Sequence, residues 1–236
     1  MRKLIYIIFF YSSLCTSQIS ITLKIIGKNS GPNNGRRLEI RIKNETEVSY
    51  ALPIDTVDFK PFYQDESCTD FSEPDNLMLA NNFENERGET SMAIPGFTLL
   101  GTIDENDKKV IKEMQRRKSR VELQQRETKL WKKKNKIGKS VIWAAKNKFL
   151  YSNILILKPK QEIIYYKIFS PEKFNLDSIT GNYNYYNFNL NEYYLFSLNY
   201  CVDYKIYQYL TQKQKDKLSG YQLFSGYLRS NVLRWD

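Results

Sequence analysis

Two stretches near the start of the chain alternate apolar and polar residues with a period of two. Residues 19–25 place isoleucine or leucine at every second position, and residues 38–43 repeat the pattern. Only an extended strand sends alternate side chains to opposite faces, so each stretch predicts a strand with one buried face. Residues 29–35 lie between them and are rich in Asn, Gly and Pro, which indicates a loop. The chain is therefore expected to fold mainly as β-sheet.

More short strands are predicted downstream, where β-branched and aromatic runs are separated by turn residues. These runs are residues 48–54, 77–79, 93–100, 153–157, 162–169, 192–202 and 221–235. Thr211 is a good helix N-cap and Gly220 a good terminator, so residues 212–218 predict one short helix. So many short strands in one chain favour two packed sheets, that is, a β-sandwich.

The N-terminus has the layout of a secretory signal peptide. Arg2 and Lys3 precede an apolar run at residues 4–14, which is too short for the roughly 20 residues of a membrane-spanning helix. The small residues that a signal peptidase prefers follow at 15–17. We expect residues 1–17 to be removed and the protein to be exported to the periplasm or the outer cell envelope. The alternative is a buried N-terminal strand.

Cys15 offers a second route to the envelope, as a lipid-anchored cysteine. The residue before a lipidated cysteine is normally small, and here it is Leu14, so a lipoprotein is the lesser alternative. No other apolar run in the sequence is long enough to cross a membrane. Residues 18–236, the mature chain under this hypothesis, suffice for one large domain or two small ones.

The chain contains no histidine. This absence excludes Ser-His-Asp triads, Cys-His nucleophile pairs and every zinc site that uses imidazole. A zinc site built from cysteine alone needs more than the two cysteines that follow residues 1–17. Carboxylate and Ser-Lys mechanisms remain, and no motif for either stands out. We therefore predict a non-enzymatic protein without a bound cofactor.

Positive charge is concentrated in one segment. Residues 108–139 hold fourteen Lys or Arg against three Glu, whereas the whole chain has a formal net charge of +10, so the rest is close to neutral. Residues 104–136 contain no Gly or Pro and predict one long helix that is broken near Gly138. We expect a helical insertion at about 104–148 in the β fold.

The densest basic clusters of this segment are the candidate anion-contacting residues. They are Arg116, Arg117, Lys118, Arg120, Lys132, Lys133, Lys134 and Lys136. Such clusters suit a phosphate-bearing partner, either an anionic membrane surface or a nucleic acid. Val110, Met114 and Val121 lie on one helix face and Leu123 and Leu130 nearly opposite, so the apolar stripe is thinner than in a membrane-surface helix. The alternative is a solvated helix, and export would leave no specific nucleic acid as partner.

Residues 55–75 carry the opposite charge, with seven acidic residues against Lys60 alone, and are predicted to form a long loop. Three interpretations stay open: a solvated loop, a calcium site, and a pair of catalytic carboxylates. The calcium candidates are Asp65, Glu66 and Asp70, although their spacing matches no EF-hand loop. A carboxylate pair would make the protein a glycan hydrolase, which is the first alternative function.

Two further features concern cysteine and tyrosine. Cys68 and Cys201 form a candidate disulfide, because an even pair in an oxidising compartment is normally bridged. The alternative is two separate small apolar side chains.

Residues 181–200 are rich in Tyr, Phe and Asn, which is typical of sugar-binding surfaces and equally of strand cores. The core interpretation is favoured, and only residues 183–188 lie where a binding loop is expected.

Two segments resemble parts of a known fold. Residues 38–55 give a strand, an Asn-x-Thr turn and a second strand that ends in Leu52-Pro53, and Leu157-Lys158-Pro159 precedes an aromatic strand with Tyr165, Tyr166 and Phe169. Both resemble elements of immunoglobulin-like β-sandwich domains in exported bacterial proteins. The resemblance implies a sandwich and no activity, and the basic helix departs from its pattern.

The sequence thus predicts a single immunoglobulin-like β-sandwich over residues 18–236 with a long basic helical insertion. The expected function is an interaction or structural module of the cell envelope, with an envelope protein, a glycan or an anionic membrane surface as partner. The alternatives are a carboxylate-dependent glycan hydrolase and, if the chain is not exported, a nucleic-acid binder that uses the basic helix.

Overall fold

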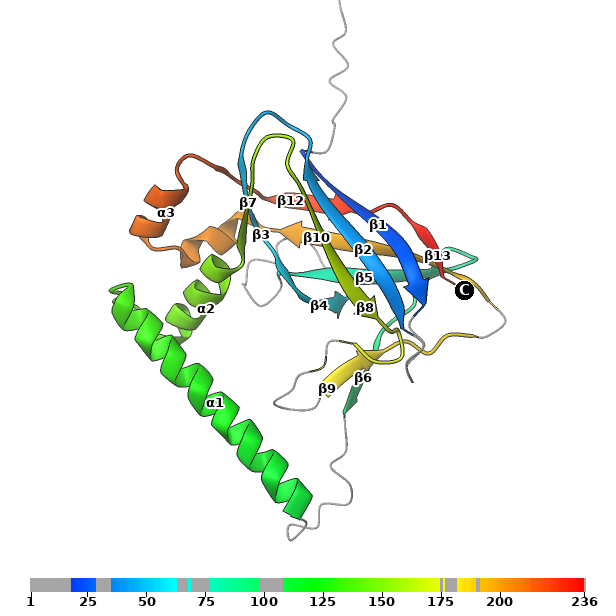
Figure 1. The fold of residues 1–236 in the computed structure, drawn as a ribbon, viewed down its shortest axis with the longest axis horizontal. Coiled ribbons are helices and arrows are strands. Elements are labelled where there is room, and N and C mark those ends of the chain that lie inside the picture. The colour runs from blue at the N-terminus through cyan, green and yellow to red at the C-terminus, as the bar shows by residue number, and fades with distance from the viewer. Residues whose placement is uncertain are drawn as a thin grey trace, which may run out of the picture.

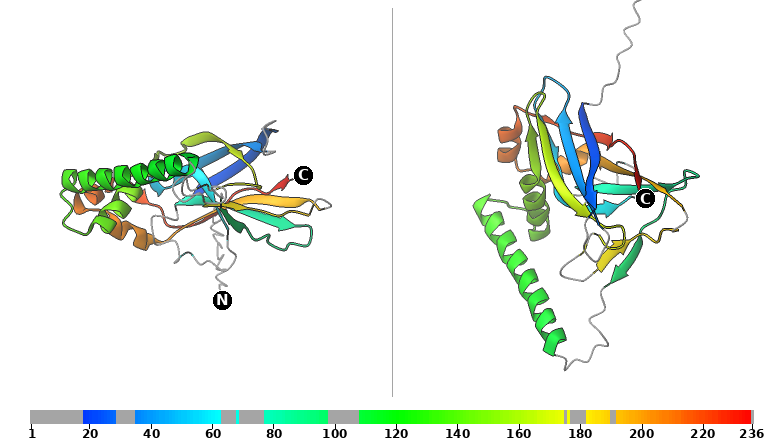
Figure 2. Two further views of the ribbon diagram at one scale, coloured as in Figure 1. Left: turned by 90° about the horizontal axis from the view of Figure 1, so that it is seen from below. Right: turned by 45° about the vertical axis from the view of Figure 1, so that its right-hand side comes forward.

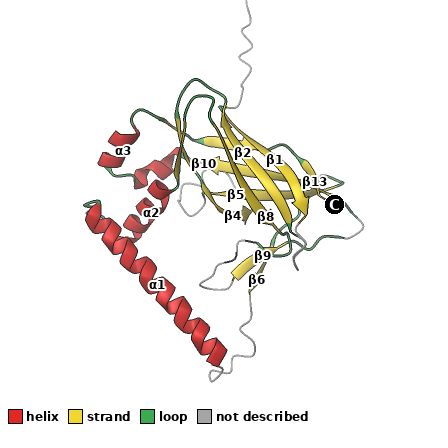
Figure 3. Ribbon diagram, viewed as in Figure 1, coloured by secondary structure: helices red, strands yellow, loops and turns green. Residues whose placement is uncertain are grey.

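The computed structural model describes residues 18–28, 35–62, 68, 77–97, 108–174, 176, 182–189 and 192–235. Within these ranges the fold is mainly β, with the helices gathered at one end of the sheets (Figure 1, Figure 3). The predicted signal peptide, residues 1–17, lies outside the described residues, as do the calcium candidates Asp65, Glu66 and Asp70.

The first sheet is antiparallel and has the order β1-β2-β8. Its strands are β1 (Ile19–Lys28), β2 (Arg36–Asn44) and β8 (Glu162–Phe169). Leu23 pairs with Ile40, and Ile40 pairs with Tyr165, so the period-two residues of the three strands share one face. The predicted alternation is confirmed, because Leu23 and Ile40 are buried while Lys24 and Thr22 are exposed.

The second sheet has the order β12-β10-β5-β4, and β13 also pairs with β10. Its strands are β4 (Asp55–Pro61), β5 (Met78–Asn85), β10 (Tyr194–Val202), β12 (Gly226–Arg229) and β13 (Leu233–Trp235). Smaller sheets are formed by β3 (Tyr50–Pro53), β7 (Ile154–Leu157) and β11 (Gln222–Leu223), and by β6 (Ile94–Phe97) and β9 (Asn182–Tyr185).

The first sheet lies across the second, and the facing side chains form one buried core (Figure 2). Phe83 and Phe196 of the second sheet pack with 4.7 Å between ring centroids, and Phe169 of the first sheet stacks on Phe196 at 5.5 Å. Trp235 packs edge-on to all three rings. Aromatic pairs at these separations add to the stability that burial provides, so this cluster joins the two layers.

Two strand pairings depart from an immunoglobulin domain, whose sheets are antiparallel. β4 runs parallel to β5, and β11 runs parallel to β3. The prediction that residues 55–75 form one long loop is wrong, because β4 begins at Asp55. Phe59 on this strand is buried in the core, which outweighs the acidic composition that favoured a loop.

The helical segment contains α1 (Lys108–Lys134) and α2 (Val141–Ser152), which are separated by a turn around Gly138. A 3₁₀ helix, η3 (Tyr204–Tyr209), leads into α3 (Gln212–Leu218). Thr211 caps α3 in a reciprocal capping box with Gln214, so the predicted short helix is confirmed. Among the described residues, no helix is long and apolar enough to cross a membrane.

Candidate functional site: a basic helix and the helical corner that anchors it

All eight predicted anion-contacting residues lie on α1 or on the turn that follows it. Arg117 and Lys132 are half-buried, and the others are exposed, namely Arg116, Lys118, Arg120, Lys133, Lys134 and Lys136. The last turn of α1 holds Lys132, Lys133 and Lys134, which is the end where the helix dipole stabilises positive charge. We call these eight residues the basic ridge of α1. Consecutive members such as Lys132, Lys133 and Lys134 point about 100° apart around the helix, so the basic ridge covers more than one side of it.

Only a narrow face of α1 packs against the protein. Thr128 is buried, and Val121 and Trp131 are half-buried; the spacings of seven and three residues place all three on one helix face. Leu123 and Leu130 on the other side are 56% and 59% exposed. The C-terminal part of α1 lies beside α2, while its N-terminal end lies well away from α2 (Figure 1). Most of the helix surface is thus available to a partner.

A shallow hollow on α1 surrounds the exposed Leu130. Arg126, Lys129 and Lys133 form most of its wall, and Glu122 is its one carboxylate. An exposed apolar side chain beside three basic ones suits a surface that offers anionic groups above an apolar layer.

A buried amide network fixes α1 and α2 to η3 and α3. The Asn147 side chain is fully buried, and its Oδ1 accepts from Trp131 Nε1 at 2.8 Å. Its Nδ2 donates to the Tyr209 carbonyl oxygen at 2.5 Å and to Gln214 Oε1 at 2.6 Å, and Gln214 Nε2 donates back to Asn147 Oδ1 at 3.2 Å. Every donor and acceptor of Asn147 is therefore satisfied, which makes this corner rigid.

The end of α1 forms a Schellman motif. Ile137 N–H donates to the Lys132 carbonyl and Lys136 N–H to the Lys133 carbonyl, at 3.0 and 3.2 Å. Lys136 occupies the left-handed position of this motif with φ of 52°, where glycine is usual. Ile137, the residue that follows Lys136 in the motif, is buried.

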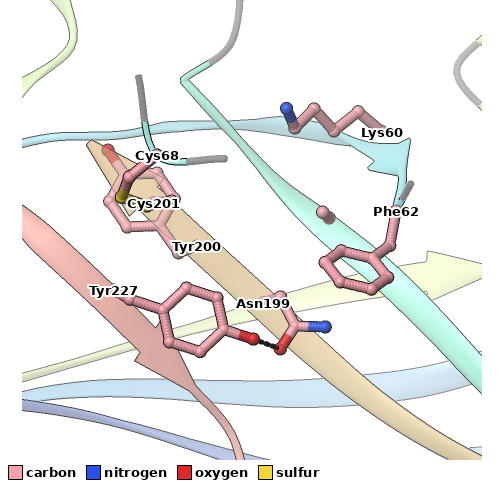
Figure 4. A pocket seen from close by; sticks show the side chains of 8 residues that line it. Lys60, Phe62, Cys68, Asn199, Tyr200, Cys201 and Tyr227 are labelled. Carbon is pink, nitrogen blue, oxygen red and sulfur yellow. Dashed lines mark hydrogen bonds between the residues drawn. A yellow bond between two sulfur atoms is a disulfide. The ribbon is translucent and has the colours of Figure 1, made fainter. Parts of the chain in front are cut away.

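The structure joins Cys68 and Cys201 in a disulfide, with 5.5 Å between their Cα atoms. Beside it lies a cavity of about 250 Å³ that is lined by residues of β4, β5, β10 and β12 (Figure 4). Its wall includes Lys60, Phe62 and Asn199, and the Tyr227 hydroxyl donates to Asn199 Oδ1. Among the described residues, no carboxylate lines this cavity.

Tyr200, next to the bridged Cys201, is fully buried, and its hydroxyl has no hydrogen-bond partner in the described part of the chain. Burial raises its pKa well above the ordinary value of tyrosine, and the nearby Tyr207 contributes. The hydroxyl therefore stays neutral and does not serve as a base or nucleophile at ordinary pH.

The calcium candidates lie outside the described residues, and the aromatic run of residues 181–200 is described for residues 182–189 and 192–200. No group of three or more acidic or cysteine side chains in the described residues could hold a metal ion. Tyr186 and Phe188 pack against Phe83, and the Tyr186 hydroxyl donates to Asn81 Oδ1 at 2.8 Å. The core interpretation is confirmed for Tyr186, which is buried.

Sequence reasoning missed Asn147, because one Asn inside a helical stretch carries no signal of its buried partners. Gln214 was within reach, since Thr211-x-x-Gln214 is a capping-box pattern. No protein-family model matches this chain, and no curated protein or solved structure matches it either.

Proposed function

We propose that this protein is a non-enzymatic module of the cell envelope that contacts an anionic membrane surface through the basic ridge of α1. The observation that carries the proposal is the exposure of the basic residues along a helix that buries only a narrow face. Export as residues 18–236 and the immunoglobulin-like relationship belong to this proposal.

Charge complementarity favours a phosphate-bearing surface. Helix α1 has no acidic residue in its first turn and three lysines in its last. A Lys or Arg near an anionic membrane surface contributes about 1 kcal/mol of binding free energy. Several such residues acting together therefore give useful affinity without a deep pocket.

The test is flotation of the purified protein with phosphatidylglycerol-containing vesicles, with pure phosphatidylcholine vesicles as the neutral reference. The variant carries Gln at Lys118, Lys129, Lys133 and Lys134, which are all exposed on α1. Removal of four charges at about 1 kcal/mol each is expected to weaken vesicle binding roughly a hundredfold to a thousandfold. Binding of the unmodified protein should also weaken steeply with salt, because the charges are screened.

A matched control removes the same number of lysines elsewhere. Gln at Lys205, Lys213, Lys215 and Lys217, all exposed on or near α3, gives the same net charge. This control variant should retain most of the binding. Equal loss in the two variants, or no preference for phosphatidylglycerol, would contradict the proposal.

Nucleic acid is the alternative outcome of the same experiment. If duplex DNA displaces the vesicles and binds more tightly than they do, the ridge is a nucleic-acid surface and the envelope proposal fails.

A further inference from the structure

A notch opens between two segments that are far apart in the sequence: the turn between α1 and α2, and the residues that join η3 to α3. Its volume is about 520 Å³, within the range of small-molecule sites. The residues that supply its chemistry are Lys136, Lys139, Trp143, Gln208, Tyr209 and Thr211. The described residues that line it include two lysines and no acidic residue, so the notch is electropositive.

The buried amide network holds one wall of the notch in place. The Tyr209 carbonyl accepts from Asn147 Nδ2 at 2.5 Å, and Thr211 N–H donates to Gln214 Oε1 at 2.8 Å. Because both partners are buried side chains, this wall is formed before any ligand arrives.

The opposite wall contains a strained residue. Lys136 has φ of 52°, a conformation that disfavours any residue with a Cβ, at a position where glycine would be relaxed. Residues with a strained backbone are often found at functional sites, and the strained residue here is a lysine that lines the notch.

Aromatic rings complete the site. Trp143 and Tyr209 lie with 6.2 Å between ring centroids and 47° between planes, and both are half-buried. Lys146 Nζ lies 5.3 Å from the Tyr209 ring and adds positive charge beside it. Tilted rings with partly open faces pack well against the C–H face of a flat, hydroxylated molecule.

We propose that the notch binds a short anionic saccharide, a sugar that carries a phosphate or a carboxylate. Lys136 and Lys139 pair with the anionic group, and Trp143 and Tyr209 contact the apolar face of the ring. Gln208 offers hydrogen bonds to the hydroxyl groups, while the Thr211 hydroxyl is engaged with Gln214. The volume exceeds what phosphate alone would fill, and the rings would gain nothing from phosphate alone.

This inference rests on the proposed function, which supplies one source of the ligand. A lipid with a saccharide headgroup would contact the notch at the same membrane surface that the basic ridge contacts. A free saccharide has the same chemistry. Binding of a soluble sugar phosphate is measured without vesicles. Failure of the saccharide proposal and failure of the membrane proposal therefore give different results.

The experiment is a titration of the full protein with glucose 6-phosphate, followed by NMR of the indole N–H signals. The chain has three tryptophans, and the Trp143 signal is assigned by its loss in Trp143→Phe. Glucose 6-phosphate should shift this signal saturably, with glucose and inorganic phosphate each binding at least about tenfold more weakly. Lys139→Gln should weaken glucose 6-phosphate binding about tenfold, whereas Lys213→Gln on α3 should leave it unchanged.

Two results would overturn the inference. One is the absence of a saturable shift at Trp143 while the protein remains folded. The other is equal binding of inorganic phosphate and glucose 6-phosphate, which would leave only an unspecific anion contact. If the shift is present, binding to vesicles with phosphatidylinositol is compared with binding to vesicles with phosphatidylglycerol. A preference for the inositol lipid that disappears in Lys139→Gln supports a lipid headgroup as the ligand. Equal binding to the two kinds of vesicle supports a free saccharide.

Discussion

Replacement of Asn147 by Leu is the most informative perturbation of the helical corner. Leu has the same branched arrangement of side-chain heavy atoms as Asn but forms none of its four hydrogen bonds, so Gln214 and the Tyr209 carbonyl lose their buried partner. Each such bond contributes about 1 kcal/mol net, and a buried group left unsatisfied costs about 1–3 kcal/mol. We expect the free energy of unfolding to fall by about 3–5 kcal/mol, a large share of the stability of a typical domain.

The assay is urea unfolding followed by circular dichroism and tryptophan fluorescence. Asn187→Leu is the matched control, because Asn187 is exposed, and it should change the free energy of unfolding by less than about 0.5 kcal/mol. The double variant with Gln214→Leu should cost clearly less than the sum of the single variants, since both partners of the same bonds are then gone. Additive costs, or a loss below about 1 kcal/mol for Asn147→Leu, would refute the account of the network.

Four further predictions follow from individual features. Lys136→Gly should raise the free energy of unfolding by about 1 kcal/mol in the same urea assay, because glycine relaxes the φ of 52°; a loss of stability would contradict the role of strain. Reduction of Cys68–Cys201, which are separated by 133 residues, should lower the free energy of unfolding by about 5 kcal/mol, measured against the oxidised protein, and an unchanged midpoint would rule this out. The Glu39 pKa is lowered by its hydrogen bond from Arg41, and the Glu45 pKa by its hydrogen bonds from Lys43 and Ser20. The stability that these two carboxylates contribute is therefore present above about pH 4.5 and lost as the pH falls below it. Because the chain has no histidine, thermal midpoints should stay level from about pH 5 to 8. Burial raises the pKa of Tyr165, Tyr200 and Tyr207, so the folded state is favoured below about pH 10 and loses stability above it. The part of the phenolate absorbance that these three tyrosines contribute should therefore rise only together with loss of circular dichroism, and its appearance in a protein that stays folded near pH 10 would argue against their burial.

The strands with one buried face could be predicted from the sequence because period-two alternation follows directly from extended geometry. Residues 19–25 fall within β1, and residues 38–43 fall within β2. Helix α3 was equally accessible, since its capping box is a local pattern.

Other features depend on contacts between distant segments. Strand β4 was hidden by its acidic residues, because its place in the sheet is decided by the pairing of Phe59 with Leu79. The notch lies between the turn around Gly138 and Tyr209, and no local sequence pattern shows that these two segments are close in space. Polar side chains such as Asn147 acquire their role only when the partners are in place.

The basic residues of the candidate site could be predicted individually, because the charge of a side chain follows from its residue type. Their exposure was not, because it depends on which face of α1 meets α2. Thr128 and Trp131 form that face, and no long apolar stripe marks it.

The most direct test of the envelope account is the intact mass of the protein produced with its own N-terminus in a Gram-negative host. The account predicts the mass of residues 18–236 less two hydrogens, which reports export, cleavage after Ser17 and the Cys68–Cys201 bridge at once. An uncleaved and reduced chain of residues 1–236 would contradict the account.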